Sequence, residues 1–341
     1  MDFNHFLSTH LLNTEYRPRE LYEDMVEQAI SADKLGYRGV SIPEHHLINI
    51  LMLPSPLQMA VKLSSLTKRL ELVTSVLVLP VHDMRVLAGE IIQADILCDQ
   101  RLILGVGRGA FPYELERMGA PVKETAAKFN ESLAVLEALL NHEEVSWRGK
   151  FYDFDPITIM PRPERKLPIM IAAMSPEGIY HSVKKGYSVQ TTPLSGTHDA
   201  LLAQTSAFHK AKEEAGENED RPRLALQRGV YLARDETDAA EKIGFAYEYF
   251  KRFDNVYSGP GLVSRGIIEP LRRTQTIEEL ARNLLICTKD EMIDRLSMYQ
   301  NAGIDEIILS SNYGQPQEDT LDMMHRFAEE IMPHFSARKS A

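Results

Sequence analysis

Residues 19–46 read RELYEDMVEQAISADKLGYRGVSIPEHH, and this stretch contains a helix, a break and a strand in succession. Apolar residues recur at the three- and four-residue spacing of one helix face: Leu21, Met25, Ala29 and Ala32. This spacing predicts a helix from Arg19 to Leu35, which Gly36 ends. The apolar run from Gly39 to Pro43 then predicts a strand, and the polar sequence Glu44-His45-His46 follows it directly.

The same alternation of strand-like and helix-like segments continues through the chain. Eight strands are expected: Phe3–Leu7, Gly39–Pro43, Leu70–Leu79, Leu102–Val106, Ile169–Ala173, Tyr187–Thr191, Leu224–Ala233 and Ile304–Leu309. Alternating strands and helices predict an α/β fold with a parallel sheet. Eight such units in 341 residues predict a closed (β/α)8 TIM barrel, formed as a single domain over residues 1–341. An open doubly wound sheet remains an alternative, because hydrophobic periodicity does not detect closure.

One long segment, Asp254–Thr276, shows neither the periodicity of a helix nor that of a strand. It contains residues that interrupt regular structure: Gly259, Pro260, Gly261, Gly266 and Pro270. Irregular segments of this length in a compact domain are usually functional or disordered. We therefore interpret residues 254–276 as a mobile active-site lid inserted into the barrel.

The composition excludes several functional classes. Lys and Arg number 38 against 49 Asp and Glu, and the net charge of −11 argues against nucleic acid, which needs a basic surface. Two cysteines are too few for a disulfide framework. The chain lacks an apolar stretch long enough for a transmembrane helix, and its start lacks the pattern of a signal peptide. These observations favour a cytoplasmic protein without a membrane partner.

Enzymes with (β/α)8 barrels place their chemistry at the carboxyl ends of the strands. Glu44-His45-His46 follows the second strand, and the alternation of side chains predicts that one histidine points into the barrel mouth and the other away. The alternative is a polar strand end with a satisfied histidine. No metal site is expected, because adjacent histidines do not share a face and the chain has no His-x-His or His-Glu-x-x-His motif.

Two neighbouring strands end in residues that suit an anion. Gly105-Val106-Gly107-Arg108-Gly109 offers small residues for close approach of the backbone and a guanidinium that can clamp two oxygens. Ser175, Pro176 and Glu177 predict a capped helix start, whose free N–H groups suit a phosphate. Each feature alone is better explained by a tight turn or a capped helix, but together they favour one shared phosphate site.

Two apolar segments flank these strand ends. Thr74–Pro80 is explained either as a plain buried strand or as the floor beneath a flat aromatic cofactor. Leu47–Leu53 is interrupted only by Asn49, and it either lines an apolar substrate site or packs under a neighbouring segment.

Taken in order, these segments resemble the bacterial luciferase-like family of flavin-dependent monooxygenases over almost the whole chain. The stretches that carry the resemblance are Leu35–His46, Leu79–Arg85, Arg101–Gly109, Gly149–Tyr152, Pro168–Glu177, Asn301–Ile307 and Ile331–Phe335. Each motif is short, but their common order is specific. The sequence departs from the family at Asp83-Met84 and at Met174, where the luciferase catalytic subunit has a glutamate.

The resemblance implies a barrel that binds reduced FMN non-covalently, forms a homodimer and receives the flavin from a separate NAD(P)H:flavin reductase. Dioxygen then adds to the flavin, and the flavin peroxide oxidises a small organic substrate, which we expect to be an apolar carbonyl or a similar compound. By position, His45 is the catalytic histidine, which holds or carries a proton. Arg108 and Ser175, with Pro176 and Glu177 after it, are implied to hold the flavin phosphate.

The Ser75–Val76 bond lies where the family often has a cis peptide beneath the flavin. Three other hypotheses remain. A deazaflavin-dependent oxidoreductase of the same superfamily transfers hydride without dioxygen, and Glu44-His45-His46 favours the monooxygenase over it. A non-catalytic flavin-binding subunit similar to the luciferase partner chain is disfavoured, because that partner lacks the equivalent of Arg108 and has an asparagine in its histidine motif. An unrelated (β/α)8 enzyme is the last alternative.

Overall fold

The computed structural model describes residues 1–11, 18–216 and 222–335. Its centre is a ring of eight parallel strands, β1 (Asp2–Phe6), β2 (Gly39–Ile42), β3 (Glu71–Thr74), β5 (Leu102–Gly107), β8 (Ile169–Ala172), β9 (Ser188–Thr191), β10 (Leu224–Leu232) and β14 (Glu306–Ser310). Each strand pairs with the next in this order, and β14 pairs with β1, which closes the ring. The predicted (β/α)8 barrel is therefore confirmed, and the open sheet is excluded.

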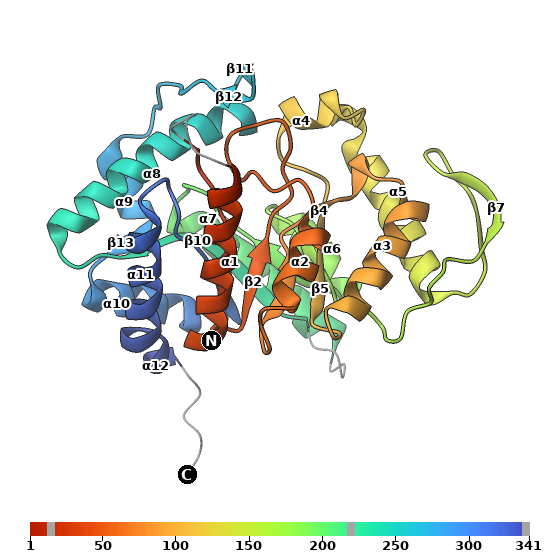
Figure 1. The fold of residues 1–341 in the computed structure, drawn as a ribbon, viewed down its shortest axis with the longest axis horizontal. Helices are drawn as coiled ribbons and strands as arrows, with labels where there is room; N and C mark the ends of the chain where they lie inside the picture. The colour runs from red at the N-terminus through yellow and green to blue at the C-terminus, as the bar shows by residue number, and fades with distance from the viewer. Residues whose placement is uncertain (12–17, 217–221, 336–341) are drawn as a thin grey trace, which may run out of the picture.

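Helices surround the ring (Figure 1). They are α1 (Pro18–Leu35), α2 (Pro56–Ser64), α3 (Met84–Leu97), α4 (Pro112–Arg117), α5 (Val122–Asn141), α6 (Pro176–Lys184), α7 (His198–Ala215), α8 (Glu236–Tyr257), α9 (Ile277–Asn283), α10 (Lys289–Asn301), α11 (Gln317–Glu330) and α12 (Met332–Phe335). The apolar stripe predicted on α1 is buried, as expected for a helix that covers a barrel. No helix of the described chain is long and apolar enough to cross a membrane.

The third predicted strand is divided in the structure. Leu70–Leu79 is expected as one strand, but β3 ends at Thr74 and a cis peptide bond joins Ser75 to Val76. The strand resumes as β4 (Leu77–Val78), which pairs with β5 and leads into the short 3-10 helix η1 (Leu79–Val81). The cis bond agrees with the resemblance, whereas the division leaves no trace in the hydrophobic pattern.

One short strand, β13 (Leu285–Cys287), is absent from the expected set, because three residues carry too little pattern to be recognised. It pairs with Val230–Leu232, the second half of β10. The first half of β10 pairs with β9 and β14 within the ring. Outside the ring stand two hairpins, β6 (Val145–Arg148) with β7 (Asp153–Ile157) and β11 (Val263–Ser264) with β12 (Ile267–Ile268).

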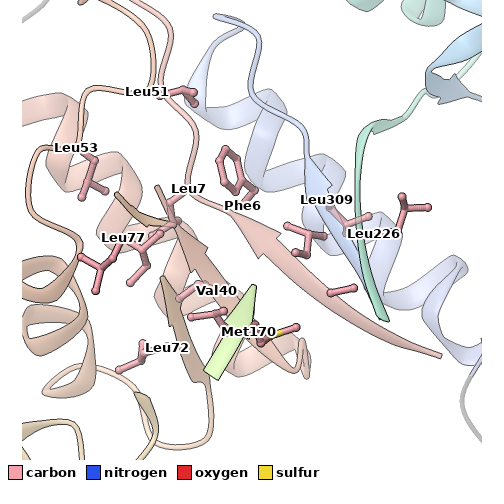
Figure 2. Close-up of a cluster of buried hydrophobic side chains, with 14 of the residues drawn as sticks. Phe6, Leu7, Val40, Leu51, Leu53, Leu72, Leu77, Met170, Leu226 and Leu309 are labelled. Carbon is pink, nitrogen blue, oxygen red and sulfur yellow. The ribbon is translucent and has the colours of Figure 1, made fainter. Parts of the chain in front are cut away.

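The hydrophobic core is continuous from the ring to the helices and includes the loop after β2. Figure 2 shows Leu51 and Leu53 of this loop among side chains of the barrel. Ile50, Leu51 and Leu53 are each at most 5% exposed, and only Leu47 of this run is largely exposed. Of the two interpretations of Leu47–Leu53, packing under a neighbouring segment is therefore the correct one for most of the run.

Gly105 in β5 lies where the barrel leaves no room for a side chain. A Cβ atom there would stand 1.9 Å from the carbonyl oxygen of Thr74. Gly107 is similarly close to the neighbouring segment, because its Cβ would stand 2.7 Å from Cγ2 of Val76. These glycines serve the close approach of two backbone segments. The expected anion site after β5 therefore depends on Arg108 and not on the glycines.

Charged side chains cover the amino-terminal face of the barrel. Arg38 pairs with Asp2 at 2.8 Å and with Glu71 at 2.7 Å, and Arg223 pairs with Asp2 at 2.6 Å. Glu306 lies 3.8 Å from Arg38 and 3.7 Å from Arg223, and it is buried. Burial raises the pKa of Glu306 to about 7, against the opposing attraction of Arg223.

Glu306→Gln is expected to change the pH dependence of stability. The pKa of Glu306 rises from 4.5 to about 7 on folding, so the folded state binds this proton more tightly, and rising pH destabilises the wild type across that window. This loss of stability amounts to about 3 kcal/mol, and it is absent in the variant because glutamine does not ionise. The free energy of unfolding is measured in urea at about pH 5 and about pH 8. Between the two pH values the variant should become more stable relative to the wild type by up to that amount. The exposed Glu143→Gln is the control, and an equal effect of Glu306→Gln at both pH values would contradict the expectation.

Candidate functional site

The predicted site residues follow four strands that are consecutive in the ring. His45 follows β2, the Ser75–Val76 bond follows β3, Arg108 follows β5, and Ser175 follows β8. Because these strands are parallel, all four positions lie at the carboxyl-terminal end of the barrel. In Figure 1 the chain starts at the bottom, and this end is at the top, where α4 and the β11–β12 hairpin lie.

The ring of His45 is fixed by two residues of one short segment. It stacks on Phe111 with the ring centroids 4.4 Å apart and an interplanar angle of 26°. Its Nδ1 lies 3.0 Å from Oε2 of Glu114, a buried carboxylate on α4. An ionised carboxylate can only accept a hydrogen bond, so Nδ1 carries a proton and Nε2 is the remaining ring nitrogen. The sequence analysis identified His45 but neither Phe111 nor Glu114.

His46 contacts a different carboxylate. Glu44 is buried, and its Oε1 accepts hydrogen bonds from Nε2 of His46 at 3.0 Å and from Nε2 of His82 at 2.7 Å. Burial opposes ionisation of Glu44, but the bonds from both histidines hold its pKa below the usual value. The hydrogen bond to Glu44 raises the pKa of His46. In the described residues, no group of three or more His, Cys, Asp and Glu is arranged to hold a metal ion.

The segment around the cis bond is held from both sides. Before the bond, the hydroxyl of Ser75 donates to Oε1 of Gln190 at 2.7 Å, and Gln190 is itself buried in the barrel. After the bond, the backbone N–H of Val78 donates to Oε2 of Glu44 at 2.7 Å. These contacts hold the segment on either side of the Ser75–Val76 bond, and the sequence analysis did not identify Gln190 as a residue that does so.

The two predicted phosphate-binding elements are both exposed. Arg108 is exposed, and within the described chain its guanidinium has neither an ion pair nor a hydrogen bond. Ser175 caps α6, since its hydroxyl accepts the N–H of Gly178 at 3.1 Å. Pro176 has no N–H, so the amide of Glu177 is the donor that the first turn leaves available.

The end of α8 reaches the same region. The hydroxyl of Tyr257 donates to Sδ of Met174 at 3.8 Å. Burial raises the pKa of Tyr257, against the opposing positive charge of Arg108. Tyr257 is thus a further residue of this site, and it touches the methionine at which the sequence departs from the luciferase catalytic subunit.

Aromatic rings connect Tyr257 to His45. Tyr249, Phe253 and Tyr257 recur at four-residue spacing on α8 and stack at centroid distances of 5.9 and 5.5 Å. Phe253 meets Phe111 edge to face at 5.3 Å, and Phe111 stacks on His45. We call Tyr249, Phe253 and Tyr257 the aromatic ladder. The ladder does not contact His45 itself but packs behind Phe111, so apolar side chains fill the space behind the ring that covers His45.

Residues 254–276 are more ordered than the sequence indicates. Helix α8 continues to Tyr257, and the β11–β12 hairpin follows it. The fully buried Asn255 donates from Nδ2 to the carbonyls of Leu262 and Glu269 at 3.1 and 2.7 Å, and its Oδ1 accepts the N–H of Leu262 at 2.9 Å. Asn49 accepts the N–H of Ile268 at 2.9 Å and so ties the hairpin to the loop after β2. The hairpin is not expected from the sequence, because strands of two residues show no periodicity, whereas residues 258–262 and 269–276 are irregular as expected.

Comparison with known proteins gives a consistent result. The profile of the luciferase-like monooxygenase family matches residues 1–306. The oxygenase component of a flavin-dependent trigonelline monooxygenase from Acinetobacter baylyi is 29% identical over 99% of this chain and 97% of its own length. An F420-dependent glucose-6-phosphate dehydrogenase from Amycolatopsis mediterranei is 25% identical over 92% of this chain and 95% of its own.

The similarity extends to a solved structure. The crystal structure of the monooxygenase RslO1 from Streptomyces bottropensis matches with a TM-score of 0.84 and 25% identity, over 98% of this chain and 100% of that one. The chain is therefore similar to both flavin-dependent and F420-dependent oxidoreductases along nearly its full length.

Proposed function

Because the chain belongs to the luciferase-like monooxygenase family, we propose that it is the oxygenase component of a two-component, FMN-dependent monooxygenase. The observation that carries this proposal is the arrangement at the barrel mouth. Four consecutive strands offer an exposed arginine and a helix start for a phosphate, a hydrogen-bonded backbone segment for a flat ring, and a histidine held by a carboxylate. The name of the Acinetobacter baylyi relative, a flavin-dependent oxygenase component, supports it.

The residues present fit reduced FMN. Arg108, the hydroxyl of Ser175 and the N–H of Glu177 would hold the phosphate, with Pro176 shaping the start of α6. Ser75 and Val76 would lie beneath the ring, where the backbone is fixed from both sides. When bound, reduced FMN supplies the two electrons with which dioxygen is split, so that one oxygen atom enters the substrate and the other leaves as water.

His45 is the proposed catalytic residue. Its Nδ1 is engaged by Glu114, so Nε2 is the atom that would hydrogen-bond the reacting oxygen and exchange a proton with it. Phe111 and the aromatic ladder keep water from this side of the ring. Without proton exchange at Nε2 and the exclusion of water, reduced oxygen would leave as hydrogen peroxide before it reached the substrate.

The substrate of this proposal is a small and largely apolar compound such as a carbonyl. The apolar ring of Phe111, which stacks on His45, supports this class. Trigonelline, named for the relative from Acinetobacter baylyi, is zwitterionic and lies outside this class, so it is tested beside an apolar ketone. We propose that an NAD(P)H:flavin reductase supplies the reduced flavin. We further propose that the active form is a homodimer and that it resides in the cytoplasm.

Residues 254–276 are the proposed lid over this site. Asn255→Ala is expected to open the hairpin, because three hydrogen bonds of about 1 kcal/mol each are lost. An opening equilibrium shifted by about 3 kcal/mol raises the open population roughly 100-fold. Limited proteolysis should show faster cleavage within residues 258–270. The exposed Asn141→Ala is the control, and wild-type cleavage rates in Asn255→Ala would contradict the role of Asn255.

Anaerobic titration with reduced FMN tests the proposed function. We expect saturable binding, followed on addition of air and trigonelline or a small apolar ketone by an oxygenated product detected by mass spectrometry. The same titration with reduced F420 tests the alternative that the dehydrogenase relative raises. Binding of F420 but not FMN, with hydride transfer in the absence of dioxygen, would replace the proposal. Binding of neither would remove Arg108 and Ser175 from a cofactor site.

A further inference from the structure

Glu114 makes two hydrogen bonds that constrain each other. Its Oε2 lies 3.0 Å from Nδ1 of His45, and its Oε1 accepts the backbone N–H of His46 at 2.5 Å. The backbone N–H can only donate, so Oε1 must remain an acceptor. Glu114 is 7% exposed, and in the described residues its only ion-pair partner is His45. A buried carboxylate with these two partners is satisfied only while both donate to it.

The segment that carries Glu114 fixes the imidazole in two directions. Phe111 covers the face of the His45 ring, and Glu114, three residues later, binds its edge. The stacking restricts the plane of the ring, and the hydrogen bond restricts its rotation within that plane. The result is one orientation and one tautomer, with the proton on Nδ1 when the ring is neutral.

We propose that Glu114 is a positioning residue that confines the proton exchange of His45 to Nε2. The carboxylate accepts a hydrogen bond from Nδ1 whether the imidazole is neutral or protonated. Nε2 is therefore the ring nitrogen that gains and loses a proton. This inference rests on the proposed function, in which Nε2 meets the reacting oxygen. A merely structural Glu114 would instead hold the turn at His46 and leave the tautomer of His45 unimportant.

Glu114→Gln separates these two roles. The amide oxygen must face the N–H of His46, because that group cannot accept, so the amide NH2 must face Nδ1 of His45. Nδ1 then has to accept, and the ring proton moves to Nε2. The variant therefore keeps the turn and the fold but inverts the tautomer of His45. Glu116→Gln, an exposed residue on the same helix, is the matched control.

Nitrogen-15 NMR of histidine side chains in the flavin-free protein reads the tautomer directly. The His45 signals are assigned by their loss in His45→Gln and followed across pH, so that the neutral ring is observed. We expect Nδ1–H in the wild type and in Glu116→Gln, and Nε2–H in Glu114→Gln. With reduced FMN, air and the trigonelline or ketone substrate of the titration above, we expect Glu114→Gln to lower the yield of oxygenated product at least about 100-fold. Hydrogen peroxide release should rise.

Two results would overturn the inference. One is Nε2–H in the wild type, and the other is unchanged product yield in a Glu114→Gln variant whose tautomer is inverted. Glu114→Asp keeps a carboxylate and should retain Nδ1–H, so loss of Nδ1–H there would also count against it. If the wild type forms no product with reduced FMN, the proposed function fails, whereas the NMR result still decides whether Glu114 sets the tautomer.

Discussion

His45→Ala is expected to abolish product formation while leaving flavin binding intact. A positioned acid or base contributes about 100- to 10,000-fold to a proton-transfer step, so the product yield should fall by that factor. The electrons of the flavin would still reach dioxygen, and hydrogen peroxide should approach one molecule per reduced FMN consumed. Single-turnover mixing of the anaerobic complex with air and substrate, with product and peroxide measured together, checks both expectations.

Two controls sharpen this test. His142→Ala removes an exposed histidine far from the barrel mouth in sequence and should behave as the wild type. His46→Gln changes the neighbouring ring, which binds Glu44 and not Glu114, and should preserve the balance of product over peroxide. A product yield unchanged in His45→Ala would remove His45 from the mechanism. Equal losses in His45→Ala and His46→Gln would indicate a structural role for the whole motif.

Arg108→Ala is expected to weaken FMN binding far more than riboflavin binding. The guanidinium is exposed and has no partner among the described residues, so its removal leaves no buried group unsatisfied. Hydrogen bonds to charged groups contribute about 1.5–3 kcal/mol, which corresponds to roughly a 10- to 150-fold rise in the Kd of FMN. Riboflavin has no phosphate, and its Kd should stay within about twofold. Anaerobic titrations with both reduced flavins measure the difference.

The control for this variant is an arginine of similar exposure. Arg117→Ala removes a side chain that covers the ring of Tyr113 on α4, and it should leave both flavin affinities unchanged. If Arg108→Ala weakened FMN and riboflavin to the same degree, Arg108 would be holding the shape of the site and not the phosphate. The phosphate would then have to be assigned to the start of α6 alone.

The barrel could be predicted because its signals are local and repeated. Leu21 to Ala32 form a stripe that is buried against the ring, and each expected strand overlaps one ring strand. What escaped prediction is short or depends on one residue. The strand Leu285–Cys287 has no room for a pattern. The β11–β12 hairpin is held by Asn255, whose hydrogen bonds to Leu262 and Glu269 join positions that sequence periodicity does not relate.

The candidate site was predicted in part for a similar reason. His45, Arg108 and Ser175 stand directly after strands, where barrel chemistry is expected. Glu114 and Gln190 could not be found in this way, since each is a common polar residue whose role comes from a contact with a segment about 70 or more residues away in sequence. Their signal is three-dimensional: a buried polar side chain whose partner is a site residue.

The two halves of β10 have a practical meaning for engineering. Residues 224–229 complete the ring, and from Val230 the strand leaves the ring and pairs with β13. The chain between Ala233 and Leu284 therefore departs from one strand and returns beside it, and it carries the aromatic ladder and the β11–β12 hairpin as one unit. Recombination between relatives at these two points would transplant that unit whole, with every strand pairing of the barrel inherited unchanged.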